Sequence, residues 1–141
     1  MHFVTREHIH VDRIATAWAI RRWVDAEATF EFVPRTRDMA TLTGIPFDIR
    51  GADLSHRPGR CTLDALIGRY ELRDPALRQM AAIIRGADLP QEDPSPVEVP
   101  GVLAIFDGIR ELCTTDPERL ERGSTVCDAL YAYCSQRLCA R

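Results

Sequence analysis

The feature that most constrains the fold is a change in hydrophobic periodicity near the start of the chain. Residues His2–Thr5 favour a β-strand, whereas the apolar residues between Val11 and Asp25 recur at helical spacing. Thr29–Val33 then alternates between polar and apolar residues, which is typical of a strand, and Pro34 ends it. A strand, a helix and a second strand in this order predict a βαβ unit whose two strands are parallel.

The remainder of the chain is predicted to contain one more short strand and several helices. We expect a short helix over 37–43, a strand over 46–49, and further helices over 61–70, 75–86, 102–112 and 123–137. Asp74 is a good N-cap before Pro75, and residues 89–100 are expected to form an extended surface connection. The predicted fold is a small α/β domain, with a mainly parallel sheet of about three strands flanked by helices and a helical C-terminal half.

Length and composition narrow the class of protein. The 141 residues are expected to form a single domain over 1–141, and no apolar run approaches the roughly 20 residues of a membrane span. The net charge of −3 gives no general nucleic-acid footprint, and without a recognisable signal peptide we expect a cytoplasmic protein that makes no membrane contact. All 18 basic residues are arginine, which pairs well with oxyanions but excludes lysine-based Schiff-base or P-loop chemistry.

The five cysteines are predicted to be free thiols. Their number is odd and no Cys-x-x-Cys motif occurs, so neither a thioredoxin motif nor a zinc ribbon is present. Cys127 and Cys134 lie seven residues apart on a predicted helix and share one face. We expect both to be buried as small apolar side chains.

The first candidate site is His8-Ile-His10-Val-Asp12, where the first strand leads into the first helix. In an extended segment the side chains of His8, His10 and Asp12 lie on one side, and this set could hold a divalent Zn, Mn or Fe ion. The alternative is that His10 caps the helix and His8 is exposed.

The second candidate site is the glycine-containing loop after the third predicted strand, with the polar residues Asp48, Asp53, His56, Arg57, Arg60, Cys61 and Asp64. His56 and Cys61 lie five residues apart and suit either a metal site or an activated nucleophile, with Cys61 and Asp64 as candidate catalytic residues. The alternative makes Cys61 the start of a helix and His56 a loop hydrogen bonder. If the strands are parallel, His56 and Cys61 approach His8, His10 and Asp12 across one crevice at the carboxyl edge of the sheet.

Several arginines could gather near the same loops. Guanidinium groups around a strand-to-helix junction would form an oxyanion pocket, because helix N-termini already attract anions. The candidates are Arg13, Arg21, Arg22, Arg57 and Arg60. The alternative is surface pairing of Arg21 and Arg22 with Glu31 or Asp25, and Asp128 is expected to pair with an arginine for structural reasons.

Six motifs in order along the chain resemble the chromate-resistance protein family, in the ChrB C-terminal type of domain. They are Val4–Glu7 with Val11–Trp23, Pro46–Ile49, Leu54–His56 with Cys61–Ile67, Asp74–Leu77, Ile84–Asp88 and Cys127–Cys134. The family pattern carries over to Asp12, Arg13, Arg21, Arg22, His56, Cys61, Asp64, Asp88 and Asp128. Many members have Pro-Lys where this chain has His8-Ile-His10, so a metal site at these histidines would be confined to a subset of the family.

The resemblance implies a role in bacterial chromate resistance. We therefore expect a domain that senses or processes an oxyanion such as chromate, with Arg13, Arg22 and Arg57 holding the anion and Cys61 responding to oxidation. The family's regulators carry an additional N-terminal DNA-binding region, and this chain begins directly at the Val4 motif, so DNA binding by this chain alone is not expected.

Two other functions remain open. His8-Ile-His10-Val-Asp12 is also similar to the start of DHH-type metal phosphoesterases, although Leu54-Ser-His56 stands where those enzymes have Asp-His-His. That similarity implies a metal-dependent hydrolase in which Asp48 or Asp53 and His56 are the later metal ligands and the metal activates water. A third alternative is a partner-binding domain that forms a homodimer through its aromatic C-terminal helix.

Overall fold

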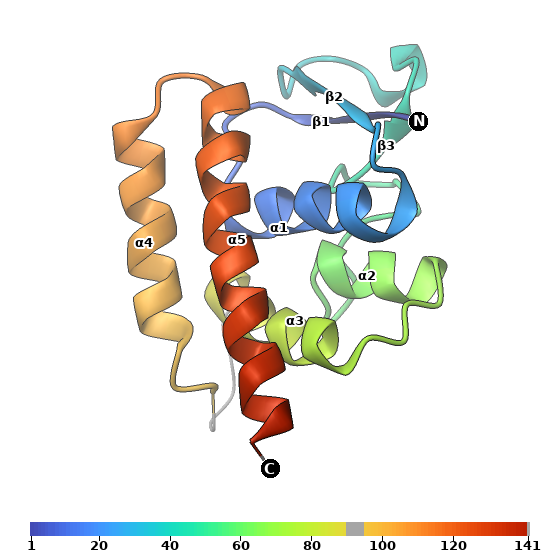
Figure 1. Ribbon diagram of the computed structural model, residues 1–141. Coiled ribbons are helices and arrows are strands. Elements are labelled where there is room, and N and C mark those ends of the chain that lie inside the picture. Colours follow the sequence, from blue (N-terminus) through green and yellow to red (C-terminus); the bar gives the residue numbers. More distant parts are fainter. Residues whose placement is uncertain (90–94, 141) are drawn as a thin grey trace.

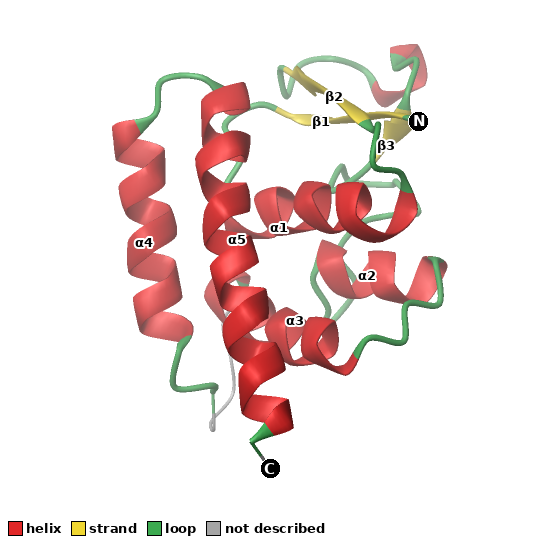
Figure 2. Ribbon diagram, in the orientation of Figure 1, coloured by secondary structure: helices red, strands yellow, loops and turns green. Residues whose placement is uncertain are grey.

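The computed structural model describes residues 1–89 and 95–140, and it has a three-stranded sheet with helices packed beneath and beside it (Figures 1 and 2). The strands are β1 (His2–Arg6), β2 (Thr29–Val33) and β3 (Ile45–Pro46). The helices are α1 (Val11–Ala19), α2 (Thr62–Arg69), α3 (Pro75–Asp88), α4 (Val99–Leu112) and α5 (Asp116–Cys139), with a π-helix η1 (Ile20–Val24) and a 3-10 helix η2 (Met39–Thr41). The predicted fold class is confirmed.

The sheet has the strand order β2-β1-β3, and both neighbours are parallel to β1. In the register, Phe3 of β1 lies opposite Phe30 of β2 and Ile45 of β3. Because all strands run the same way, the chain leaves all three at one edge of the sheet. The segment that enters α1 and the loop that follows β3 therefore start side by side, as the sequence predicted.

Helix α1 is the centre of the core. Val11, Ile14 and Trp18 are buried at helical spacing, and α1 packs against α2, α3 and α5. In Figure 1, α1 lies below the strands, α2 and α3 lie below α1, and α4 and α5 stand side by side along one side of the molecule. Cys127 and Cys134 are both buried on α5, as predicted.

The predicted helix over Val11–Asp25 is present, but its winding changes at Ile20. The N–H of Asp25 donates to the carbonyl of Ile20 at 2.9 Å, five residues back, which closes a wider π-helical turn. The strand predicted over 46–49 is shorter than expected because Asp48 has a left-handed backbone, with a φ of 49°, that cannot continue a strand.

The C-terminal half is more helical than the periodicity indicated. Helix α5 begins at Asp116 rather than at 123, because Thr115 accepts a hydrogen bond from the N–H of Glu118 and caps the helix. Helix α4 begins at Val99 rather than at 102. The extended connection predicted over 89–100 lies partly outside the described residues.

Candidate functional site

Three carboxylates surround one imidazole at the carboxyl edge of the sheet. Nδ1 of His56 lies 2.7 Å from Oδ1 of Asp48, and Nε2 lies 2.6 Å from Oδ2 of Asp88 and 3.6 Å from Oδ2 of Asp12. The four residues come from the start of α1, the loop after β3 and the end of α3. The parallel topology therefore brings together side chains that lie far apart in the sequence.

Asp12 is the buried member of this cluster, with 2% of its surface exposed. Its two oxygens accept hydrogen bonds from the backbone N–H groups of Thr62, at 2.8 Å, and Leu63, at 3.1 Å, which are the first residues of α2. Burial, together with the carboxylates of Asp88 and Asp48, raises the pKa of Asp12 to about 6. Asp12 thus binds the N-terminus of α2 to the N-terminus of α1 and directs negative charge into the site.

Asp48 connects the cluster to an arginine. Nε of Arg13 lies 3.0 Å from Oδ2 of Asp48, and a second nitrogen of Arg13 donates to the Asp48 carbonyl. The N–H of Asp48 donates to the carbonyl of Leu54 at 2.7 Å, which pins the loop that carries His56. The left-handed backbone of Asp48 turns the chain toward the crevice at this point.

His56 is held at both ring nitrogens. Its partial burial acts to lower its pKa, but the hydrogen bond with Asp88 and the nearby carboxylates of Asp48 and Asp12 outweigh burial and raise the pKa. The imidazolium form is therefore stabilised when the site contains no other cation.

A pocket with a volume of about 540 Å³ opens beside this cluster, and arginines dominate its lining. His56 and Asp48 form part of its wall, so the pocket and the cluster share two residues. The arginines that line it are Arg6, Arg13, Arg35, Arg50 and Arg57. Of these five, Arg6 donates to two backbone carbonyls and Arg13 pairs with Asp48.

The two N-terminal histidines that the sequence proposed as metal ligands lie apart from the cluster. The side chain of His8 is 77% exposed and lies 3.6 Å from Glu7. Nε2 of His10 lies 3.0 Å from Asp107 on α4. Within the described part of the chain, the His, Cys and carboxylate set with converging ligand atoms is Asp12, Asp48 and His56. Asp12 and His56 do meet as predicted, and the structure places Asp48 with them.

Cys61 and Asp64 form the start of α2 rather than a nucleophile and its base. The Cys61 thiol is buried and donates to Oδ2 of Asp64, whose other oxygen pairs with Arg85 at 2.8 Å. Burial and the neighbouring Asp12 carboxylate raise the pKa of the Cys61 thiol far above its ordinary value. The arrangement matches the alternative in which Cys61 starts a helix.

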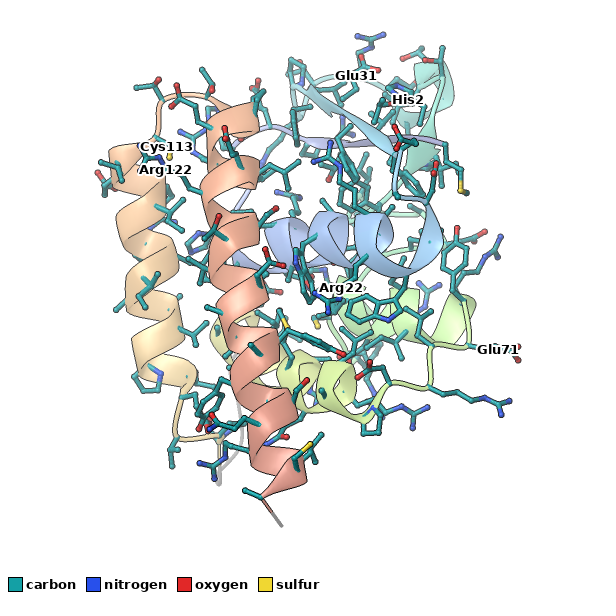
Figure 3. The ribbon with its side chains drawn as sticks, viewed as in Figure 1. His2, Arg22, Glu31, Glu71, Cys113 and Arg122 are labelled. Carbon is teal, nitrogen blue, oxygen red and sulfur yellow. The ribbon has the colours of Figure 1, made fainter. Side chains whose placement is uncertain are left out.

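Of the other predicted arginines, Arg57 lines the pocket but Arg21 and Arg22 do not. Arg21 donates to the carbonyl of Ala28 and stacks on Phe30. The guanidinium of Arg22 lies against the rings of Trp18, Trp23 and Tyr131 and 3.8 Å from Asp128, next to α5 (Figure 3). The predicted pairing of Asp128 with an arginine is therefore present. Arg60 lines a second pocket, between α2 and α3.

Sequence reasoning missed three of the pocket arginines: Arg6, Arg35 and Arg50. Arg6 ends β1, Arg35 follows β2, and Arg50 follows β3. Their shared position just after the strands was a usable signal, because parallel strands place these points at one edge of the sheet. Asp88 was indicated only through the family resemblance, since nothing in its local sequence separates it from a helix-end carboxylate.

The fold and the crevice define the chain as a small parallel α/β domain with a charged site at the carboxyl edge of its sheet. The family model described as ChrB, C-terminal domain, matches residues 3–134. Protein ChrB of Cupriavidus metallidurans (strain ATCC 43123 / DSM 2839 / NBRC 102507 / CH34) is 33% identical over 135 residues, which is 94% of this chain and 40% of that protein. The chain therefore belongs to the ChrB C-terminal domain family, and it spans about 40% of the length of this relative.

Further comparisons bear on the alternatives. No solved structure matches the chain. The family match and the relative give no support to the phosphoesterase alternative.

Among the helices of residues 1–89 and 95–140, none has both the length and the apolar character needed to cross a bilayer.

Proposed function

We propose that this chain binds a tetrahedral oxyanion of the chromate type in the arginine-lined pocket, and that it acts as a sensing domain in chromate resistance. The observation that carries the proposal is the lining itself: five guanidinium groups and His56 around one cavity, with Asp48 as the acidic wall residue. Guanidinium groups form short, paired hydrogen bonds with oxyanions, and several of them together offset the desolvation of a dianion.

The pocket arginines divide into those that are engaged and those that are available. Arg6 and Arg13 are held by backbone carbonyls and by Asp48, so they form a fixed positive wall. Within the part of the chain that the structure describes, the guanidinium groups of Arg35 and Arg50 make no hydrogen bond or ion pair. These two groups, with Arg57, can turn toward an anion without first breaking an ion pair.

The site supports binding rather than thiol oxidation as the sensing step. Cys61 is fully buried and its raised pKa keeps it a neutral thiol, whereas the thiolate is the form that gives up electrons readily. In this proposal the anion is recognised by charge and shape, and Cys61 serves to start α2.

Isothermal titration of the chain with chromate and with sulfate tests the proposal. We expect binding that weakens with added salt and becomes about tenfold weaker or more in Arg57→Gln and Arg50→Gln, because each loses a charge-assisted hydrogen bond of about 1.5–3 kcal/mol. Arg110→Gln, which removes a guanidinium paired with Asp107 on α4, is the matched control and should bind like the parent. The proposal is wrong if neither anion binds, or if the pocket variants and the control behave alike.

A further inference from the structure

We propose that Asp12, Asp48 and His56 form a binding site for one divalent transition-metal ion, with Asp88 positioning the imidazole. One ligand atom from each of the three residues lies within 4.8 Å of the other two. The site is a mixed set of one nitrogen and two carboxylate donors contributed by three separate segments. The metal site does not require an anion in the pocket, although the two sites share Asp48 and His56.

Burial distinguishes this set from a surface group of acidic residues. The Asp12 side chain is 98% buried, and the side chain of Asp48 is 12% exposed. The amides of Thr62 and Leu63 fix the Asp12 carboxylate, so it cannot turn away to find solvent. A carboxylate oriented by backbone donors resembles the outer-shell support that metal ligands usually have.

Three carboxylates surround one imidazole in this cluster, and Arg13 is paired with one of them, Asp48. Imidazole and carboxylate groups that converge in this way are donors that divalent transition metals take in proteins. Coordination through Nδ1, the ring nitrogen that faces Asp48, leaves Nε2 free to donate to Asp88, as metal-bound histidines commonly donate to a carboxylate.

The donor set limits which metal ions the site can bind. Two carboxylates with one imidazole suit Zn²⁺, Fe²⁺ or Mn²⁺, whereas Mg²⁺ and Ca²⁺ prefer oxygen donors alone. The pocket beside Asp48 and His56 gives a route of entry and leaves coordination positions open to water or to a ligand. His8, His10 and Cys61 are not part of this set, which revises the ligands that the sequence proposed.

The test is metal stoichiometry in untagged, full-length chain that has been stripped with a chelator. After loading with Zn²⁺, Mn²⁺ or anaerobic Fe²⁺ and gel filtration, elemental analysis should find one equivalent of at least one of these ions, and Mg²⁺ in equal excess should not displace it. His56→Gln and Asp48→Asn should each weaken binding at least about tenfold. Circular dichroism and the thermal midpoint of the stripped proteins show whether each variant folds.

Two matched controls separate the site from general loss of charge. His8→Ala removes an imidazole beside Glu7, and Asp107→Asn removes a carboxylate that lies 3.0 Å from His10. Both should retain one equivalent. Absence of a tightly held ion in the parent, or equal occupancy in folded His56→Gln, would overturn the proposal. Sulfate and chromate are titrated against the same stripped parent, so that anion binding and metal stoichiometry are measured separately. A parent that binds an anion but holds no metal after loading would refute the metal site alone.

Discussion

The contact between α1 and α5 depends on the absence of a side chain at Gly123. A methyl group at this position would lie 2.4 Å from Cγ2 of Ile14, 3.1 Å from Cδ1 of Ile14 and 3.4 Å from Phe106. Carbon atoms pack at about 3.5–4.0 Å, so α5 or Ile14 would have to move by roughly 1 Å within a core where Ile14 is 1% exposed. Such overpacking costs about 1–3 kcal/mol, against about 0.5–1 kcal/mol gained when alanine replaces glycine inside a helix.

The difference between these two terms is about 0–2.5 kcal/mol. Because the added carbon would lie 2.4 Å from a buried side chain, we expect Gly123→Ala to fall in the upper part of that range and lower the free energy of unfolding by about 1–2 kcal/mol. Gly108→Ala is the matched control, because Gly108 is exposed on α4 with open space around it and should gain about 0.5–1 kcal/mol. Urea unfolding followed by circular dichroism measures both free energies. The m-value, which is the slope of the unfolding free energy against urea concentration, should be the same in all the proteins. In an Ile14→Ala background the cost of Gly123→Ala should fall or vanish. A Gly123→Ala protein as stable as the parent would refute the close approach of α1 and α5.

Three other outcomes follow from the described contacts. Asp74→Ala should cost about 1 kcal/mol, because Asp74 caps α3 at Leu77 and accepts from the Tyr131 hydroxyl. Partial burial of Asp74 acts to raise its pKa, but these hydrogen bonds outweigh burial and lower it. The stabilisation from Asp74 is therefore present above pH 3.8, the ordinary pKa, and is lost as the pH falls through the lowered pKa of the folded protein. Between pH 7 and pH 2 the unfolding midpoint should fall less in Asp74→Ala than in the parent, and equal falls would contradict this. A thiol reagent should modify one cysteine rapidly, the exposed Cys139, and all five after unfolding, whereas fast reaction of a second thiol would show that the core is open. Arg22→Gln should bind sulfate and chromate like the parent, since Arg22 lies outside the pocket, and a tenfold loss by titration would place it in the site.

The fold was predictable where periodicity and topology agree. The alternation in Thr29–Val33 and the helical spacing that starts at Val11 each specify one element, and strand–helix–strand order specifies parallel pairing. The start of α5 was missed because its first two turns are rich in charged residues and show little periodicity, although Thr115 and Glu118 have the spacing of a capping pair.

The sequence predicted where the site lies but not the full set of residues that form it. Parallel strands place the segment that leads to Asp12 and the loop that carries His56 at the same edge, and the two side chains do meet. The spacing of His8, His10 and Asp12 assumed an extended segment, but His8 has a left-handed backbone, with a φ of 62°, and α1 starts at Val11. The turn at His8 sends its side chain outward. The sequence offered Asp48 among the polar residues of the loop, but no local pattern revealed the left-handed backbone with which it joins the cluster.

The aromatic residues of the C-terminal helix show why composition alone does not identify an interface. Tyr131 packs against Trp18 and Trp23, and the Tyr133 hydroxyl donates to Glu98 at 2.7 Å. Both rings therefore make contacts within the chain. Homodimer formation through α5 stays a prediction whose test is the molar mass in solution across a range of concentrations.

The net charge of this chain is negative, but the lining of its pocket is mainly positive, and the pocket determines which ligand can bind. The sequence has 21 acidic and 18 basic residues, a balance that offers no broad surface to a nucleic-acid backbone. Yet five of the arginines line one pocket in which Asp48 is the acidic wall residue, while Asp12 and Asp88 belong to the adjoining cluster and do not line the pocket. A small dianion in the pocket would meet guanidinium groups first, and a cation would be held beside it by the carboxylates. The two ligands would then attract each other across His56, so that filling either site should strengthen binding at the other.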